Sequence, residues 1–371
     1  MQYRDYGNTG KISALGFGCM RLPELKQGGK HYIDEEKAIP MLRRAAELGV
    51  NYFDTGHYYC NKNSEATVGR ALKPIREQVL ISTKVPMWET KTTADFRKWL
   101  ENSLRELDTD YIDYYHFWAL DRAKLDKIFK LKLLAEAERA KAEGLIRHIS
   151  FSFHDKAEVI KEIIDRCEIM ETMLVQYNML DRSNEEMIAY AASKNIGVCA
   201  MGPVGGGKLA APTSLVKRMT GRAHTTYELA MKYVLGNPNI ACALAGMETM
   251  DMLLKNAAVA ADPSPLTEEE WRQIGDSLEQ LKRFSGLYCT ACGYCQPCPV
   301  EIDIPKIFGA YTYHNVYDLN DHAKKVWTEY LDKGGKTLKD CTNCGFCDSK
   351  CPQKIEVRKM LGKVEEALEN L

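Results

Sequence analysis

Residues 51–56 read NYFDTG, a short apolar and aromatic run that closes on an acidic side chain and a glycine. Runs of this kind are typical of buried parallel strands, because both faces of a parallel sheet are covered. Similar runs recur between residues 14 and 260, separated by longer segments with the mixed charged and apolar pattern of helices. The eight predicted strands are ALGFGCM (14–20), NYFDTG (51–56), VLISTKV (79–85), DYIDYYHFW (110–118), RHISFSFH (147–154), MLVQYNML (173–180), GVCAMGPV (197–204) and IACALAGM (240–247).

Helices are predicted in the intervening segments, and the first begins at Asp34, a typical N-cap residue, and ends at Gly49. Eight strand–helix units in about 250 residues predict an α/β fold of the (β/α)8, or TIM barrel, type. A doubly wound open sheet is the alternative, which is disfavoured because GFGCMR at 16–21 does not satisfy the GxGxxG pattern. The predicted helices span 34–48, 64–72, 92–106, 124–143, 155–166, 183–195, 226–235 and 249–260.

The composition is that of a globular protein, with 45% hydrophobic and 27% charged residues. The 50 Lys and Arg residues are balanced by 51 Asp and Glu residues, so the net charge indicates neither a nucleic-acid nor a membrane partner. The start of the chain has no apolar core of signal-peptide type, and no apolar run approaches the ~18 residues of a spanning helix. We therefore expect a cytoplasmic location.

The cysteines are the unusual part of the composition. There are 13, and eight of them lie between Cys289 and Cys351. Disulfides are unlikely to form in a reducing compartment, so a clustered set of thiols indicates metal binding. Before this region, DPSPL at 262–266 is typical of a domain boundary, and a helix is predicted at 267–284. Short helices are predicted at 301–340, between the two cysteine sets.

The second cysteine set has the C-x2-C-x2-C-x3-C-P run of bacterial ferredoxins, in which the last cysteine ligates the other cluster. The first set is one residue shorter in its last gap. Paired CxxC motifs also bind zinc, and a cluster can simply stabilise a small domain, so both alternatives stay open. The predicted ligands are Cys289, Cys292, Cys295 and Cys351 for one [4Fe–4S] cluster, and Cys341, Cys344, Cys347 and Cys298 for the other.

These observations predict three segments. Residues 1–262 form the barrel, residues 263–284 a connecting helix, and residues 285–371 a small, mostly helical, ferredoxin-like domain with two [4Fe–4S] clusters.

Polar side chains stand at consecutive strand ends of the predicted barrel. Asp54 and Tyr59 follow the second strand, Lys84 ends the third and His116 lies in the fourth. Singly, each has an ordinary structural explanation: a cap, a solvated lysine or a histidine satisfied in the core. Catalytic groups of such barrels lie at the C-terminal ends of the strands, so the four together predict an active site.

The barrel region, roughly residues 1–262, resembles the aldo-keto reductase family in NYFDTGHYYCNKNSEATVGRAL, STKV and YIDYYHFW. The resemblance implies hydride transfer between a reduced nicotinamide and a carbonyl carbon, with Asp54, Tyr59, Lys84 and His116 as the catalytic tetrad. Tyr59 would donate the proton, and Lys84, oriented by Asp54, would lower its pKa. His116 would hydrogen-bond the carbonyl oxygen.

The same resemblance implies nucleotide contacts that match less well. Ser152 fits a carboxamide contact, whereas Phe153 stands where the family places Asn. Gly246 and Met252 stand where many members carry cations for the extra phosphate of NADP, which favours NADH, although Lys255 is nearby. The implied cofactor-binding residues are Gly18, Cys19, Met20, Ser152, Gln176, Met201, Gly202, Pro203, Val204, Gly205, Gly246, Glu248 and Asn256.

Two functions follow from these features. The first is an NAD(P)H-dependent reductase of a small carbonyl or alcohol substrate, whose clusters relay electrons or sense redox state, with a possible redox partner protein. The second is an iron–sulfur electron-transfer or sensing protein, whose barrel binds a nucleotide or a partner without turnover. The intact tetrad favours the reductase. Phe153 and Met201 depart from the family's nucleotide contacts, which favours the second function.

Overall fold

The computed structural model describes residues 1–27, 30–179, 181–210, 225–262, 264–281, 289, 292–315 and 320–371. No helix in these parts of the chain is long and apolar enough to cross a bilayer. The chain divides into two compact units. The first comprises Met1–Asn178, Arg182–Pro203 and Met231–Pro265, and the second comprises Met179–Asp181, Val204–Ala230 and Leu266–Leu371.

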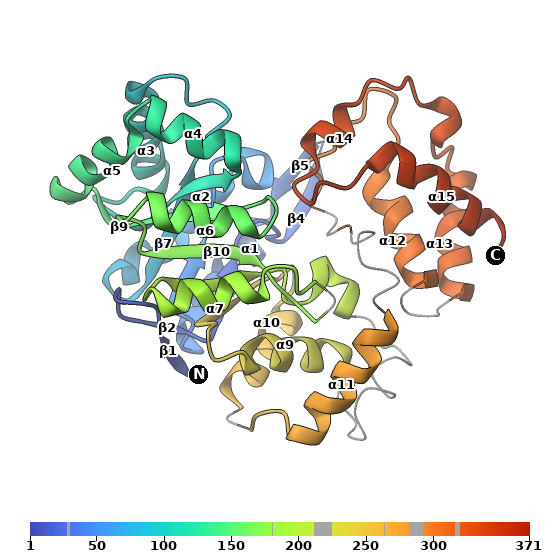
Figure 1. The fold of residues 1–371 in the computed structure, drawn as a ribbon, viewed down its shortest axis with the longest axis horizontal. Helices are drawn as coiled ribbons and strands as arrows, with labels where there is room; N and C mark the ends of the chain where they lie inside the picture. The colour runs from blue at the N-terminus through green and yellow to red at the C-terminus, as the bar shows by residue number, and fades with distance from the viewer. Residues whose placement is uncertain are drawn as a thin grey trace. The chain divides into compact units, whose positions relative to one another are not determined.

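A closed barrel of eight parallel strands forms the first unit, which confirms the predicted TIM barrel (Figure 1). Each strand pairs with the next one along the chain, and the last pairs with the first through Ala243–Leu15 and Gly246–Gly18. The strands are β3 (Leu15–Gly18), β6 (Tyr52–Asp54), β7 (Leu80–Val85), β8 (Ile112–Leu120), β9 (Ile146–Phe153), β10 (Thr172–Gln176), β11 (Gly197–Met201) and β12 (Cys242–Gly246).

The helices follow the strands in the predicted order, with one difference. The segment predicted as one helix at 124–143 forms two, because Lys132 adopts a left-handed conformation with φ of 53°. The helices are α1 (Glu35–Glu47), α2 (Ser64–Leu72), α3 (Thr93–Leu107), α4 (Arg122–Lys130), α5 (Leu133–Ala142), α6 (Glu158–Arg166), α7 (Glu185–Ser193), α9 (Thr226–Gly236) and α10 (Met250–Ala261).

Two antiparallel hairpins were not predicted from the sequence. The first joins β1 (Tyr3–Asp5) to β2 (Lys11–Ser13), and the second joins β4 (Glu24–Gln27) to β5 (Lys30–Ile33). The first hairpin carries Tyr6, whose ring is fully buried against Tyr52 and Tyr114 at 5.9 and 5.2 Å between centroids. These rings fill one level of the barrel interior.

The second unit holds the cysteine region and is helical, as predicted. Its core includes Ile307, Phe308, Trp327 and Leu361, and five cysteines pack against that core: Cys289, Cys298, Cys341, Cys347 and Cys351. The elements are η3 (Gly205–Ala210), α11 (Glu268–Leu281), α12 (Ile304–Asn315), α13 (Asn320–Asp332), η5 (Leu338–Asp340), α14 (Phe346–Lys350) and α15 (Val357–Glu369).

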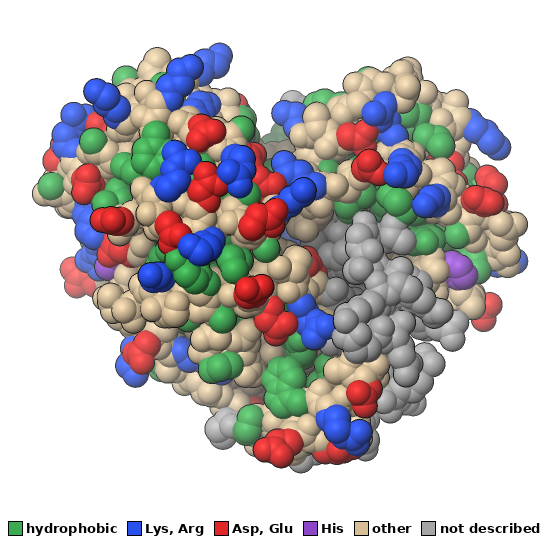
Figure 2. Space-filling model, viewed as in Figure 1, with side chains coloured by type: hydrophobic (Ala, Val, Ile, Leu, Met, Phe, Trp, Pro, Cys, Tyr) green, Lys and Arg blue, Asp and Glu red, His purple; other side chains and the backbone are tan. Residues whose placement is uncertain are grey.

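The division into units differs from the predicted segments. The segment Val204–Ala230, which includes η3 and the start of α9, groups with the second unit, where η3 contacts α12. Helix α11, within the predicted connecting segment, groups with the second unit; residues 282–284 of that predicted helix lie outside the described residues. On the face shown in Figure 2, acidic and basic side chains are interspersed, as the balanced composition predicts.

Candidate functional site

A buried ion pair joins two neighbouring barrel strands. Asp54 ends β6 and Lys84 lies on β7, and the Lys84 Nζ donates to the two Asp54 carboxylate oxygens at 2.7 and 2.8 Å. A third bond from Nζ reaches the Thr55 carbonyl oxygen at 2.5 Å. Ser82 adds a hydroxyl bond of 2.7 Å to Asp54 Oδ1. All three ammonium protons are used, so the position of Lys84 is fixed from several sides.

Tyr59 lies directly beside this pair. It begins the short turn η1 (Tyr59–Lys62), and the Lys84 Nζ lies 4.6 Å from the centroid of its ring. Burial raises the pKa of the Tyr59 phenol well above its ordinary value, and the Asp54 carboxylate raises it further. Lys84 is not among the causes of this shift, so its predicted effect on the Tyr59 pKa stays a prediction.

Aromatic side chains surround Tyr59. The Trp118 ring, from the end of β8, meets the Tyr59 ring edge-on at 5.5 Å. Trp88 contacts Trp118 at 4.9 Å between centroids and is 40% exposed, so this aromatic wall runs from the ion pair to the surface. Gly56 allows the approach, because a β-carbon there would lie 3.0 Å from the Trp118 ring.

His116 lies in the barrel interior, in register with Lys84 on the neighbouring strand β7. Side chains two residues apart on a strand share a face, so His116 is one level below Trp118. It is fully buried, and its Nε2 lies 3.4 Å from the Tyr52 hydroxyl. Burial lowers the pKa of His116 to about 3, with the Lys84 charge as the second cause, so the ring is neutral. The β8 side chain in ring contact with Tyr59 is Trp118.

The NSE sequence at 63–65 holds the Tyr59 turn in place. Ser64 donates to the Cys19 carbonyl oxygen at 2.9 Å and shares a 2.8 Å hydroxyl contact with Thr55. The buried Glu65 accepts from Thr83 at 2.6 Å, and its other oxygen lies 3.6 Å from His57 Nδ1. From the sequence, these residues were noted only as part of the family resemblance. These bonds, which link β3, β6 and β7 around Tyr59, were not predicted from it.

One predicted nucleotide residue carries an unsatisfied polar atom. Gln176, at the end of β10, is 7% exposed, and its Nε2 has no hydrogen-bond partner. A β-carbon at Gly202, which has φ of +68°, would come within 2.7 Å of that nitrogen, so only glycine fits there. Ser152 accepts a 2.7 Å bond from the Ala119 backbone N–H. A buried amide donor without a partner suits a ligand carboxamide.

The remaining predicted nucleotide residues are spread over several loops. Gly18 pairs with Gly246 in register, and the buried Cys19 donates its N–H to the Asp54 carbonyl oxygen at 2.8 Å. The side chain of Arg21, which was not predicted, passes within 3.4 Å of the β-carbon position of Gly246. Of the others, Pro203 and Asn256 are buried, Met20, Met201 and Val204 are partly buried, Gly205 is buried within the second unit, and Glu248 and Met252 are exposed.

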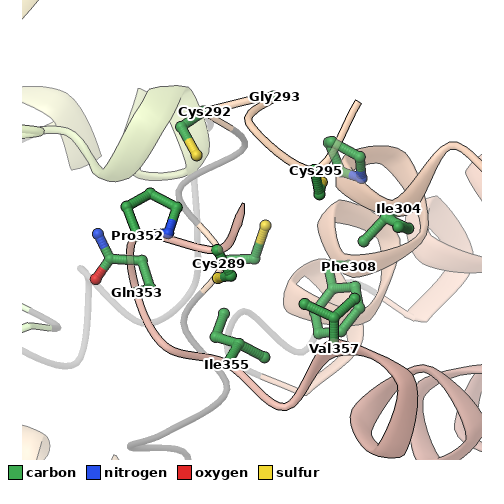
Figure 3. Close-up of a pocket in the computed structure, with 12 residues that line it drawn as sticks. Cys289, Cys292, Gly293, Cys295, Ile304, Phe308, Pro352, Gln353, Ile355 and Val357 are labelled. Carbon is green, nitrogen blue, oxygen red and sulfur yellow. The ribbon is translucent and has the colours of Figure 1, made fainter. Parts of the chain in front are cut away.

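Four cysteines from the two sets line one pocket in the second unit (Figure 3). They are Cys289, Cys292 and Cys295 of the first set and Cys351 of the second, the combination predicted for one cluster. Ile304, Phe308, Ile355 and Val357 supply much of the remaining wall. Thiolates in an apolar surrounding are the donor set of an iron–sulfur cluster, so the described residues fit that group.

The other cysteines lie in a more open setting. Cys344 is exposed, whereas Cys341, Cys347 and Cys298 are partly buried. Cys298 packs against the same core as Cys341 and Cys347. The Asn343 backbone N–H donates to the Cys341 sulfur at 3.4 Å, the kind of bond that orients a ligating thiolate.

Comparisons with known proteins agree with both parts. The aldo/keto reductase family model matches residues 14–279, and the 4Fe-4S dicluster domain model matches residues 285–355. L-galactose dehydrogenase of Arabidopsis thaliana is 26% identical over 316 residues, covering 77% of this chain and 97% of its own. Pyridoxine 4-dehydrogenase of Escherichia coli is 27% identical, covering 70% of this chain and 93% of its own.

Solved structures show the same barrel. The holo form of aldo-keto reductase AKR11C1 from Bacillus halodurans has a TM-score of 0.65 and 29% identity, covering 75% of this chain and 96% of its own. An aldo/keto reductase from Klebsiella pneumoniae, in complex with NADP and acetate, has a TM-score of 0.62 at 23% identity, covering 74% of this chain and 94% of its own. The second likeness concerns the fold alone.

Proposed function

Since this chain belongs to the aldo/keto reductase family and carries a 4Fe-4S dicluster domain, we propose that its barrel transfers hydride between a nicotinamide dinucleotide and a small carbonyl or alcohol. The observation that supports this most is the placement of Tyr59 against the buried Asp54–Lys84 pair. A barrel that only bound a partner would have no use for a buried ion pair beside a phenol.

The chemistry assigned to these residues is proton supply. The nicotinamide, when bound, provides hydride to the carbonyl carbon, and the carbonyl oxygen then needs a proton. Tyr59 holds that proton at neutral pH because burial raises the pKa of its phenol. An alkoxide is more basic than a phenolate, so donation to it stays favourable. Asp54 holds Lys84 in place, and the Lys84 ammonium would stabilise the phenolate that forms.

The unpaired Nε2 of Gln176 supports the nicotinamide end of the cofactor. For the phosphate end, the sequence favours NADH because Gly246 and Met252 bring no cation. The methylene stem of Arg21 nevertheless passes alongside Gly246, and the similar Klebsiella pneumoniae enzyme was solved with NADP. Fluorescence titration of the protein with each dinucleotide measures the preference. We predict tighter NADH binding, and at least equal NADPH affinity would contradict it and assign Arg21 to the extra phosphate.

The clusters fit a separate, one-electron role. A [4Fe–4S] cluster accepts one electron, whereas hydride carries two together, and nothing in the sequence supplies a flavin to split the pair. We therefore assign the clusters to electron relay with a redox partner protein, or to redox sensing, beside the hydride chemistry of the barrel. The two cysteine environments, one apolar and one exposed, support such a role.

A second candidate function is an iron–sulfur relay or sensor whose barrel binds nucleotide without turnover. His116 favours it, because this tetrad residue is fully buried and bonded to Tyr52. The substitution Tyr59→Phe separates the two. On the reductase proposal, it lowers carbonyl reduction about 10²–10⁴-fold across a panel of aldehydes and sugars, while cluster absorbance stays unchanged. Tyr32→Phe, at an exposed tyrosine, is the control; equal activity of both variants would remove Tyr59 from the mechanism.

A further inference from the structure

The two cysteine sites differ in the charge around them. The pocket of Cys289, Cys292, Cys295 and Cys351 has no Lys, Arg, Asp or Glu among its lining residues within the described part of the chain. The loop of Cys341, Cys344 and Cys347 instead faces a charged side chain from a different element, Arg358 in the first turn of α15.

Arg358 hydrogen-bonds two residues of this segment and passes near a third. Its Nε donates to the Asp348 carboxylate at 2.6 Å, next to Cys347. Its Nη1 donates to the Asn343 carbonyl oxygen at 3.3 Å and also contacts the Asn343 side-chain oxygen. Its Nη2 lies 3.9 Å from the β-carbon position of Gly345. Asn343 in turn donates its N–H to the Cys341 sulfur at 3.4 Å.

This clamp holds a positive charge beside three predicted ligands of one cluster. A cluster becomes more negative when it is reduced, so a nearby fixed cation stabilises the reduced form and raises the reduction potential. Asp348 partly offsets the effect, because its carboxylate is paired with the guanidinium. The apolar pocket offers its cluster no comparable charge, and low polarity disfavours the extra negative charge.

We propose that Arg358 is a positioning residue that holds the 341–347 loop and raises the reduction potential of its cluster above that of the cluster in the apolar pocket. Electrons entering the second unit then collect on the exposed site, where Cys344 reaches solvent. The inference rests on the proposed ligand sets and concerns the clusters alone, so it holds whether or not the barrel reduces carbonyls.

The test is a potentiometric titration of the full-length protein, followed anaerobically by electron paramagnetic resonance after iron and sulfide reconstitution. Arg358→Gln should shift one of two midpoint potentials to a more negative value and leave the other unchanged. Arg358→Lys keeps the charge and should restore much of that shift. Lys359→Gln is the matched control, since Lys359 is exposed on the same helix and pairs with Glu356 at 2.7 Å.

Asp348→Asn covers the case in which Arg358→Gln fails to hold its cluster. This variant keeps the cation and removes its counter-charge, so the same midpoint should move to a more positive value. Two loaded clusters whose potentials are unmoved by Asp348→Asn would overturn the role of Arg358. Equal shifts in Lys359→Gln and Arg358→Gln would overturn it as well, by showing a general charge effect. Iron and sulfide analysis of the wild type tests the clusters themselves, and their absence would overturn the ligand sets and the inference together.

Discussion

Tyr59 combines two properties that an acid catalyst needs: it is held in position and it keeps its proton. Position comes from the NSE bonds and from the packing of Trp118. The proton is kept because burial and the Asp54 carboxylate both raise the pKa of the phenol. The Lys84 charge, fully engaged with Asp54 and Thr55, does not reverse this.

This pKa direction predicts the pH profile of carbonyl reduction. An acid with a raised pKa stays protonated through the alkaline range, so kcat/KM should not fall until pH exceeds about 10, the ordinary tyrosine value. His116 should cause no change in kcat/KM near the ordinary histidine pKa, because burial lowers the pKa of His116 to about 3. Initial rates between about pH 5 and pH 10, a range that lies between the pKa values of these two groups, measure this. A decline that begins near neutrality would indicate that cofactor binding frees Lys84 to lower the Tyr59 pKa.

His116 and Trp118 also make separable predictions. A residue that hydrogen-bonds the carbonyl oxygen costs about 100-fold or more in kcat when its donor is removed. Because His116 is fully buried and its Nε2 lies 3.4 Å from the Tyr52 hydroxyl, we expect His116→Gln to change kcat/KM only a few-fold, with its cost in barrel stability instead. Trp118→Phe should alter kcat/KM more, since Trp118 contacts Tyr59. Steady-state kinetics of both variants measure the two losses. A larger loss of kcat/KM in His116→Gln than in Trp118→Phe would indicate that His116 hydrogen-bonds the substrate carbonyl.

At the scale of elements, the N-terminal hairpin closes the barrel through glycines. A β-carbon at Gly197, the first residue of β11, would lie 2.6 Å from the Tyr6 carbonyl carbon. Gly7 has φ of +60°, and a β-carbon there would lie 2.3 Å from the Asn195 carbonyl oxygen. Backbone meets backbone at both positions, so neither contact can relax by a rotamer change.

Gly197→Ala should therefore destabilise the barrel by about 1–3 kcal/mol, the usual cost of overpacking. Thermal unfolding followed by near-ultraviolet circular dichroism measures the shift of the barrel transition. Gly275→Ala is the control: this helical glycine has nothing within 4 Å of its β-carbon position, so alanine there should leave the barrel transition in place. An unshifted Gly197→Ala variant would show that the hairpin is not docked tightly.

Elements with strong periodicity were predictable, and those set by local conformation were not. The buried runs predicted all eight barrel strands in order, because a strand that is covered on both faces is apolar along most of its length. The break between α4 and α5 was missed because Lys132 carries no signal for its left-handed conformation.

For the whole molecule, the cysteine spacing predicted which thiols line one pocket. The sequence did not predict which unit the segment Val204–Ala230 groups with. C-x2-C spacing constrains a short loop tightly, and the four cysteines of the apolar pocket come together across both sets. Packing against a second unit depends on contacts far along the chain, so nothing local in GPVGGG indicates that Val204 and the residues after it group with the second unit.

The two redox sites predict a distinctive response to nicotinamide. Hydride moves as a pair of electrons, and each cluster accepts one, so NADH or NADPH alone should bind the barrel without reducing the clusters. Anaerobic titration with each dinucleotide, followed by cluster absorbance and electron paramagnetic resonance, should leave both signals in the oxidised form, whereas dithionite should reduce them. The clusters should also stay oxidised while the protein reduces an aldehyde. A cluster signal that grows with added nicotinamide would show that the two chemistries are joined within the chain, and the redox partner would then not be required.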